Sequence, residues 1–221
     1  MKLSAGSSIL DHWPEEWPSK DFYVSQHEVT LRQHTDLRRL VNAKASETEI
    51  ECFLKENPQA LALILGLFQT GHHASWVIPK QAIRARLGSH KPGLIPDYLI
   101  AGANSDGVTW WVLELKGCEA RAFSRSSSSH SLSPTANRGV VQLLEYIDVC
   151  SETQSNLRDQ LGLKGFREPR GVLLIGTDDE YTETRRKKLK AAWNRYMPKV
   201  QIRSYDALLR EVETKLQHHS K

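Results

Sequence analysis

The sequence has few cysteines and no long apolar run, and each shortage excludes a class of protein. Only three cysteines occur among the 221 residues, at Cys52, Cys118 and Cys150. They lie far apart and form no C-x-x-C pair, so neither a disulfide framework nor a cysteine-based zinc finger is indicated. No apolar run approaches the roughly 18 residues of a membrane-spanning helix. Because Met1 and Lys2 are not followed by the apolar core of a signal peptide, we expect a cytoplasmic protein without a membrane partner.

The net charge of +4 hides an uneven distribution. Residues 181–221 contain eleven Lys or Arg against four Asp or Glu, which makes this end +7 and residues 1–180 −3. The basic side chains are densest on a predicted helix over residues 182–196, at Arg185, Arg186, Lys187 and Lys188. Such a run can contact nucleic-acid phosphates or can be an ordinary solvated surface. The sequence leaves both interpretations open.

The segment from residue 94 to residue 116 has the clearest pattern in the chain. It reads LIPDYLIAGANSDGVTWWVLELK, with turn-forming residues at 102–107 between two apolar runs. A short connection of this composition favours an antiparallel hairpin. Along the second run, Glu114 and Lys116 share a face with Trp110 and Val112 because side chains alternate along a strand. Both faces are otherwise largely apolar, so the two charged groups require a charged partner, a metal ion or a ligand.

The first apolar run contains a single carboxylate, that of Asp97. A hairpin of this kind brings Asp97 opposite Val112 or Glu114. The two carboxylates then lie on one face, within roughly 5–8 Å of each other. Together with the backbone carbonyl of Leu115 they form a hard oxygen site suited to Mg²⁺ or Mn²⁺. Lys116 would lie beside a water molecule on that ion.

These residues resemble the PD-(D/E)XK nuclease signature. Asp97 follows a proline, and Glu114-Leu115-Lys116 begins seventeen positions further on. The predicted helix after Pro134 carries Gln142 and Tyr146 four residues apart, a pair that recurs in the RecB-like branch of these nucleases. The resemblance implies that Gln142 lines the site and orients water or a phosphate oxygen.

The order of predicted elements agrees with that signature. We expect helices from Ser46 and over 60–68, then a meander of three strands that begins with a strand over 76–87. A helix after Pro134 leads to a buried parallel strand over 171–176, and helix 182–196, strand 200–204 and helix 205–216 follow. This order predicts an α/β, restriction-endonuclease-like core, a mixed β-sheet (antiparallel meander plus parallel strand) flanked by helices.

Two domain regions are expected. Residues 1–45 form an N-terminal extension with a strand over 22–31, and residues 46–221 form the nuclease domain with its basic C-terminal helical part. Within the first helix of that domain, Glu49 completes an S-x-x-E capping box with Ser46. Glu49 also borders the apolar stripe of Ile50 and Phe53, which must pack on the sheet. We therefore expect Glu49 to be an additional metal ligand, with helix capping as the alternative.

The combined pattern over residues 46–210 is similar to the nuclease domain of Shedu antiphage-defence proteins. The resemblance implies a Mg²⁺-dependent nuclease that cleaves DNA in bacterial immunity and forms homo-oligomers. Asp97 and Glu114 would bind the metal, and Lys116 would position or help deprotonate the attacking water. The alternatives are a catalytically inactive nucleic-acid-binding module and an assembly protein. The intact charges at Asp97, Glu114 and Lys116 argue against the inactive binding module, because unpaired buried charges are costly, and the assembly protein stays open.

Overall fold

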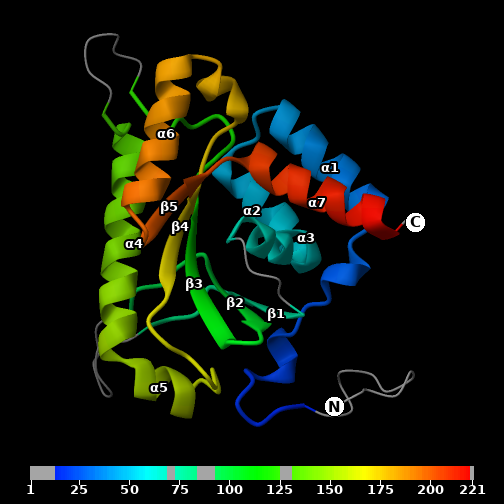
Figure 1. Cartoon of the computed structure of the whole chain (residues 1–221), viewed down its shortest axis with the longest axis vertical. Helices are drawn as coiled ribbons and strands as arrows, with labels where there is room; N and C mark the ends of the chain where they lie inside the picture. Colours follow the sequence, from blue (N-terminus) through cyan, green and yellow to red (C-terminus); the bar gives the residue numbers. More distant parts are fainter. Residues whose placement is uncertain (1–12, 69–72, 84–92, 125–130, 220–221) are drawn as a thin grey trace.

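The protein is a three-layer α/β fold in which helices cover both faces of a central sheet (Figure 1). The computed structural model describes residues 13–68, 73–83, 93–124 and 131–219. Within these residues the sheet has five strands in the order β1-β2-β3-β4-β5. Their bounds are β1 Ala74–Pro79, β2 Tyr98–Asn104, β3 Gly107–Leu115, β4 Arg170–Leu174 and β5 Val200–Arg203. Strands β1 to β3 are antiparallel, and β4 and β5 run parallel to β3. The predicted mixed sheet is therefore confirmed.

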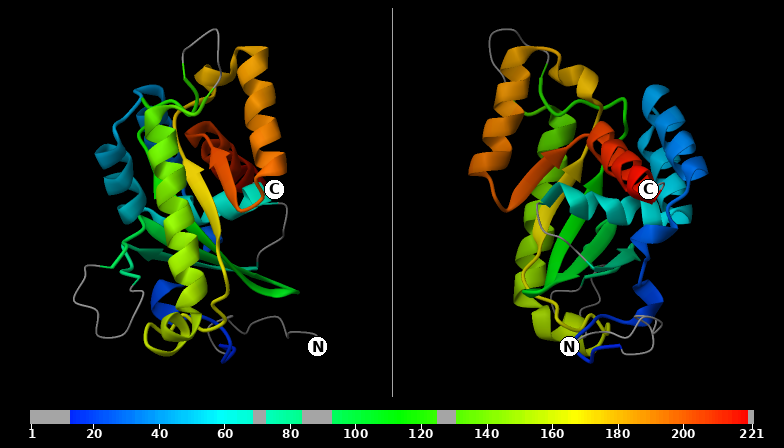
Figure 2. Two further views of the ribbon diagram at one scale, coloured as in Figure 1. Left: turned by 90° about the vertical axis from the view of Figure 1, so that its left-hand side faces the viewer. Right: turned by 45° about the vertical axis from the view of Figure 1, so that its right-hand side comes forward.

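Two groups of helices form the outer layers (Figures 1 and 2). One face is covered by α1 (Leu31–Asn42), α2 (Glu47–Glu56), α3 (Pro58–Ala62) and α7 (Tyr205–His219). The other face is covered by α4 (Pro134–Glu152), α5 (Gln154–Asp159) and α6 (Thr184–Tyr196). Short 3₁₀ helices join these elements: η1 (Lys20–Phe22), η2 (Gln26–Glu28), η3 (Leu63–Phe68) and η4 (Asp178–Tyr181). None of the described helices combines the length and the apolar character that crossing a bilayer would take.

The alternation of side chains along β3 divides the core into two halves. Trp110 and Val112 are buried on the α4 side, whereas Trp111 and Leu113 are buried on the side of α2 and α7. This is the alternation that the sequence predicts. It follows that Glu114, two residues after Val112, faces the layer that contains α4.

The β2–β3 hairpin sets the register on which the site depends. The pairing runs from Tyr98 opposite Leu113 to Asn104 opposite Gly107, so the turn is tighter than the predicted 102–107. Gly107 has φ 107°, a conformation that a side chain would strain. Continued by one residue pair, this register places Asp97 opposite Glu114.

Two of the expected strands differ from the structure. The strand expected over 22–31 is wrong, because η1 and η2 occupy this stretch and Thr30 caps α1. The strand expected over 76–87 ends at Pro79, and residues 84–87 of that prediction lie outside the described residues. Lys80 follows with φ 45°, which turns the chain out of the strand direction.

Residues of the expected N-terminal extension pack against the rest of the fold. Leu37 and Val41 of α1 are buried in the same core as Val212 of α7, and α1 and α7 lie side by side (Figure 1). This helix therefore contributes apolar surface to the layer that contains α2.

Candidate active site

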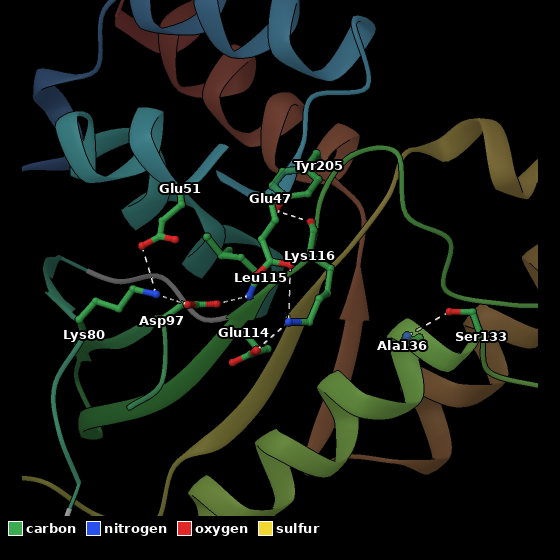
Figure 3. Close-up of polar contacts among 10 residues, drawn as sticks. All are labelled: Glu47, Glu51, Lys80, Asp97, Glu114, Leu115, Lys116, Ser133, Ala136 and Tyr205. Carbon is green, nitrogen blue, oxygen red and sulfur yellow. Dashed lines mark hydrogen bonds and ion pairs between the residues drawn. The ribbon is translucent and has the colours of Figure 1, made fainter. Parts of the chain in front are cut away.

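A pair of carboxylates lies where β2 begins and β3 ends (Figure 3). Asp97 is 8% exposed and Glu114 is 4% exposed. Asp97 Oδ2 accepts a hydrogen bond from the backbone N–H of Leu115 at 2.8 Å, which ties the start of β2 to the end of β3. The structure therefore brings together the two carboxylates that the hairpin predicts.

Lys116 completes the predicted group. Its Nζ lies 2.9 Å from Glu114 Oε1 and 3.6 Å from Glu47 Oε2 (Figure 3). Its backbone is held on two sides, since its N–H donates to Leu174 O at 2.9 Å and its carbonyl accepts from the hydroxyl of Tyr205 at 2.8 Å. The lysine thus continues the β3–β4 hydrogen bonding, and its ammonium group is directed at the carboxylates.

A second lysine, which sequence reasoning missed, contacts the other carboxylate. Lys80 Nζ lies 2.6 Å from Asp97 Oδ1 and 3.1 Å from Glu51 Oε1 (Figure 3). Its backbone N–H also donates to the carbonyl of Asp97 at 3.0 Å. The one signal in the sequence is a lysine that follows the proline at the end of an apolar strand.

The electrostatics of the site favour a cation. Four carboxylates, those of Asp97, Glu114, Glu47 and Glu51, face the two ammonium groups. Burial and the charge of Asp97 raise the pKa of Glu114 to about 7, and the hydrogen bond from Lys116 offsets only part of that rise. For Lys116, burial alone lowers the pKa, but the hydrogen bond to Glu114 and the surrounding negative charges raise it overall.

The donor set suits a hard divalent cation. Mg²⁺ is commonly bound through one or two carboxylates and retains several waters. Asp97 and Glu114 provide two such carboxylates, and the backbone carbonyl of Leu115 follows directly. In the described part of the chain, no three His, Cys, Asp or Glu side chains form a metal-holding group. A metal here would therefore complete its coordination with backbone oxygen and water.

Gln142 and Tyr146 of α4 adjoin the carboxylates. The Tyr146 hydroxyl donates to Ile95 O at 3.3 Å, and the side chain of Gln142 hydrogen-bonds with Tyr146. Burial raises the pKa of Tyr146 to about 12, and the charges of Glu114 and Asp97 add to this rise. The Q-x₃-Y pair thus lies next to the site, with Tyr146 between the sheet and α4.

The structure does not bring Glu49 to these residues. Its Oε2 accepts hydrogen bonds from the N–H and the hydroxyl of Ser46 at 2.8 and 2.7 Å, as in a capping box. Glu47 and Glu51 are four residues apart and share a face of α2, whereas Glu49 points roughly 200° of rotation away from Glu47. The structure places Glu49 in the capping role, and the acidic residues of α2 that point toward the site are Glu47 and Glu51.

The basic run lies apart from the carboxylates. Helix α6 packs on β5, an outer strand of the sheet, whereas the carboxylates belong to β2 and β3 (Figure 1). The Arg186 side chain is 13% exposed and pairs with Glu183 at 3.3 Å. Arg185, Lys187 and Lys188 are exposed. Only these three of the four predicted phosphate contacts therefore face solvent.

One comparison with known proteins gives a match. A family model described as "Shedu protein SduA, C-terminal" matches residues 44–209. No curated protein matches the chain at a significant level. The matched range extends from just before α2 into α7, and it contains all the carboxylates and lysines of the candidate site.

Proposed function

The chain belongs to the Shedu SduA C-terminal family, and we propose that it is a metal-dependent nuclease that hydrolyses phosphodiester bonds of DNA. Membership of this family associates the chain with antiphage defence and supports that biological setting. The observation that carries the chemistry is the buried Asp97–Glu114 pair with the ammonium group of Lys116 2.9 Å from Glu114. A PD-(D/E)XK site needs these three groups within reach of one phosphate.

Each group has a chemical role in this proposal. Asp97 and Glu114, with the carbonyl of Leu115, would hold Mg²⁺ or Mn²⁺. When bound, the ion would supply an activated water and offset the charge that phosphodiester attack adds beside two carboxylates. Lys116 remains protonated near neutral pH because its pKa is raised. It therefore orients the attacking water and donates to a phosphate oxygen, while Gln142 lines the site.

The decisive experiment is incubation of the purified protein with linear, nicked and supercoiled DNA in Mg²⁺, Mn²⁺ or EDTA. We expect cleavage with either metal and none with EDTA. Glu114→Gln keeps the shape of the side chain, removes its charge and should abolish cleavage. The matched control is Glu145→Gln, an exposed carboxylate of α4, which should cleave normally. Wild-type rates in Glu114→Gln would refute the assignment.

One observation favours a second candidate function. Each carboxylate of the pair already has a lysine partner, Asp97 with Lys80 and Glu114 with Lys116. A site whose charges are compensated in this way is also what a DNA-binding module without catalysis would contain. DNA binding without cleavage in either metal would select this second function.

Partner copies form a further part of the proposal. The family resemblance favours a homo-oligomer that binds DNA, and sedimentation velocity with and without DNA measures its state. A monomer under both conditions would contradict it.

A further inference from the structure

A cavity with cationic walls lies at the β5 edge of the sheet, between α6, η4 and α7. Its volume is about 470 Å³. Its walls include four cationic side chains and one carboxylate, those of Lys187, Lys190, Arg203, Arg210 and Asp178. Neither the metal site nor its lysines contribute to these walls.

The single carboxylate does not balance the four cations. Asp178 accepts hydrogen bonds from Ser204 at 2.5 Å and Arg210 at 2.8 Å, and its Oδ1 lies 3.6 Å from Lys190 Nζ. Its oxygens are thus shared among three partners. Glu211, outside the wall, also attracts Arg203 and Arg210, so two carboxylates oppose four cations and the cavity keeps an excess of positive charge, which favours an anion.

Lys190 is held in an unusual environment for an ammonium group. Its side chain is only 17% exposed, and its Nζ lies 3.9 Å from the ring centroid of Tyr181. Burial lowers the pKa of Lys190, and the charges of Arg203 and Arg210 add to this effect against the attraction of Asp178. An anion in the cavity would relieve this repulsion.

Two buried polar atoms beside the cavity have no hydrogen-bond partner in the described part of the chain. They are the hydroxyl of Tyr181, a residue that is 8% exposed, and Nε of Arg203. Buried polar groups are nearly always hydrogen-bonded. Both atoms are covered by the protein itself, so a ligand in the cavity would reach them only after side chains move, and the case for an anion rests on the charges of the cavity wall.

We infer that this cavity binds a phosphate group at a site separate from the carboxylate pair. Arginine and lysine side chains bind phosphate through charge-assisted hydrogen bonds, and the volume lies in the range of small-ligand sites. The phosphate comes from a free nucleotide or from a DNA strand that follows α6. Both sources present the same chemistry to Lys190, Arg203 and Arg210.

The cavity is connected to the carboxylate site through two adjacent residues. Ser204 donates to Asp178 in the cavity wall, and the next residue, Tyr205, donates to the carbonyl of Lys116 at 2.8 Å. A phosphate bound here would thus lie next to the segment that holds Lys116.

Calorimetric titration of the full chain in EDTA tests the inference without any dependence on cleavage. The probes are inorganic phosphate, a nucleoside monophosphate and a short DNA duplex. We expect saturable binding that weakens at least tenfold in Lys190→Met. Arg210→Gln is the second variant, because this side chain is 60% exposed and its replacement leaves the core intact. The control Lys199→Met removes an exposed cation that pairs with Glu168 outside the cavity and should bind like the wild type.

The results separate the two sources and can overturn the inference. Tight binding of the monophosphate supports a nucleotide ligand, whereas binding of the duplex alone supports a DNA phosphate. Absence of saturable binding with all three probes would overturn the inference. Equal affinities in the wild type and the Arg210→Gln variant would overturn it as well. Loss of cleavage with intact phosphate binding would concern only the proposed nuclease function.

Discussion

Glu114 combines burial with a neighbouring negative charge, and this combination links its protonation to the stability of the fold. Its pKa is raised from 4.5 to about 7. The folded state therefore binds more protons than the unfolded state between these values, and the free energy of unfolding without metal falls as pH rises through this window. At about 1.4 kcal/mol per pKa unit, the loss reaches about 3 kcal/mol above pH 7.

Glu114→Gln should remove this pH dependence. We expect the metal-free variant to unfold at a higher temperature than the wild type at pH 8 and at a similar temperature at pH 4.5. Thermal unfolding in EDTA across this pH range measures the difference, with Glu145→Gln as the control. An identical pH profile in wild type and Glu114→Gln would mean that burial and the charge of Asp97 do not raise the pKa of Glu114.

The pKa of Glu49 is shifted in the opposite direction to that of Glu114. Hydrogen bonds from Ser46 lower its pKa. A lowered folded-state pKa gives a contribution to stability that is present above the unfolded pKa and is lost as pH falls through the folded value. Glu49→Gln should therefore lower the melting temperature at pH 7 more than at pH 3, and Mg²⁺-dependent cleavage should stay normal.

Glu47→Gln is the matched comparison for this experiment. It lies in the same first turn of α2, but its carboxylate is 3.6 Å from Lys116. We expect slower cleavage in this variant, because Lys116 loses one of its two carboxylate neighbours. Slower cleavage in Glu49→Gln, together with a raised Mg²⁺ requirement, would return Glu49 to the metal site.

Among the structural elements, the strand pair β2–β3 was predicted correctly, whereas the contribution of α2 was assigned to the wrong carboxylate. The alternation along β3 and the turn residues are local features, and they determine which face Glu114 takes. The acidic residue that reaches the site from α2 depends on the rotation of the helix against the sheet. The buried residues Ile50 and Leu54 lie three positions after Glu47 and Glu51 on one helix face. Counting Phe53 in that stripe turned the predicted face toward Glu49.

Lys80 and the strand expected over 22–31 were missed for a related reason. Lys80 reaches Asp97 because the backbone turns out of β1 at this residue, which has φ 45°. A single lysine after a proline in the sequence does not predict that turn. Within residues 22–31, Tyr23 forms an isolated β-bridge with Trp76, and this bridge does not extend into a strand. Apolar alternation over a short stretch cannot distinguish this bridge from a full strand.

The first residue of α7, Tyr205, holds the backbone of Lys116 in place. Tyr205 is completely buried, and its hydroxyl donates to the carbonyl of Lys116. Tyr205→Phe removes this one hydrogen bond and should lower the free energy of unfolding by about 0.5–1.5 kcal/mol. Because the backbone of Lys116 loses an anchor, cleavage should slow while DNA affinity in EDTA stays constant.

A matched tyrosine makes this experiment specific. Tyr196, at the end of α6, is 72% exposed, so Tyr196→Phe should change neither stability nor cleavage. Equal effects of the two variants on the cleavage rate would show that the Tyr205 hydroxyl does not support Lys116.

Across the whole molecule, the carboxylate site and the cationic cavity lie apart. The carboxylates lie at β2 and β3, and the cationic side chains of α6 and α7 gather beyond β5. Adjacent strands are about 4.8 Å apart, so β3 and β5 are about 10 Å apart across the sheet. Under the proposed function, a DNA strand with its scissile phosphate at Lys116 would therefore extend neighbouring phosphates toward α6.

This separation yields a prediction about salt dependence. Each phosphate contact contributes about 0.9 to the slope of log K against log salt on duplex DNA. Changing Arg185, Lys187 and Lys188 to serine should reduce the slope by up to about 2.7 and weaken binding on all sequences alike. Arg186 is left unchanged because its largely buried side chain pairs with Glu183.

The measurement is duplex binding in EDTA at several salt concentrations, so that cleavage does not intervene. A triple variant of exposed cations outside α6, Lys55, Arg167 and Lys199, matches the change in net charge. A long-range effect of net charge alone would reduce the slope equally in both triple variants, since it does not depend on where the charges lie. A larger reduction of the slope in the α6 variant than in the control variant therefore indicates direct phosphate contacts. An unchanged slope in the α6 variant would mean that the run is a solvated surface and that DNA reaches Lys116 by another route.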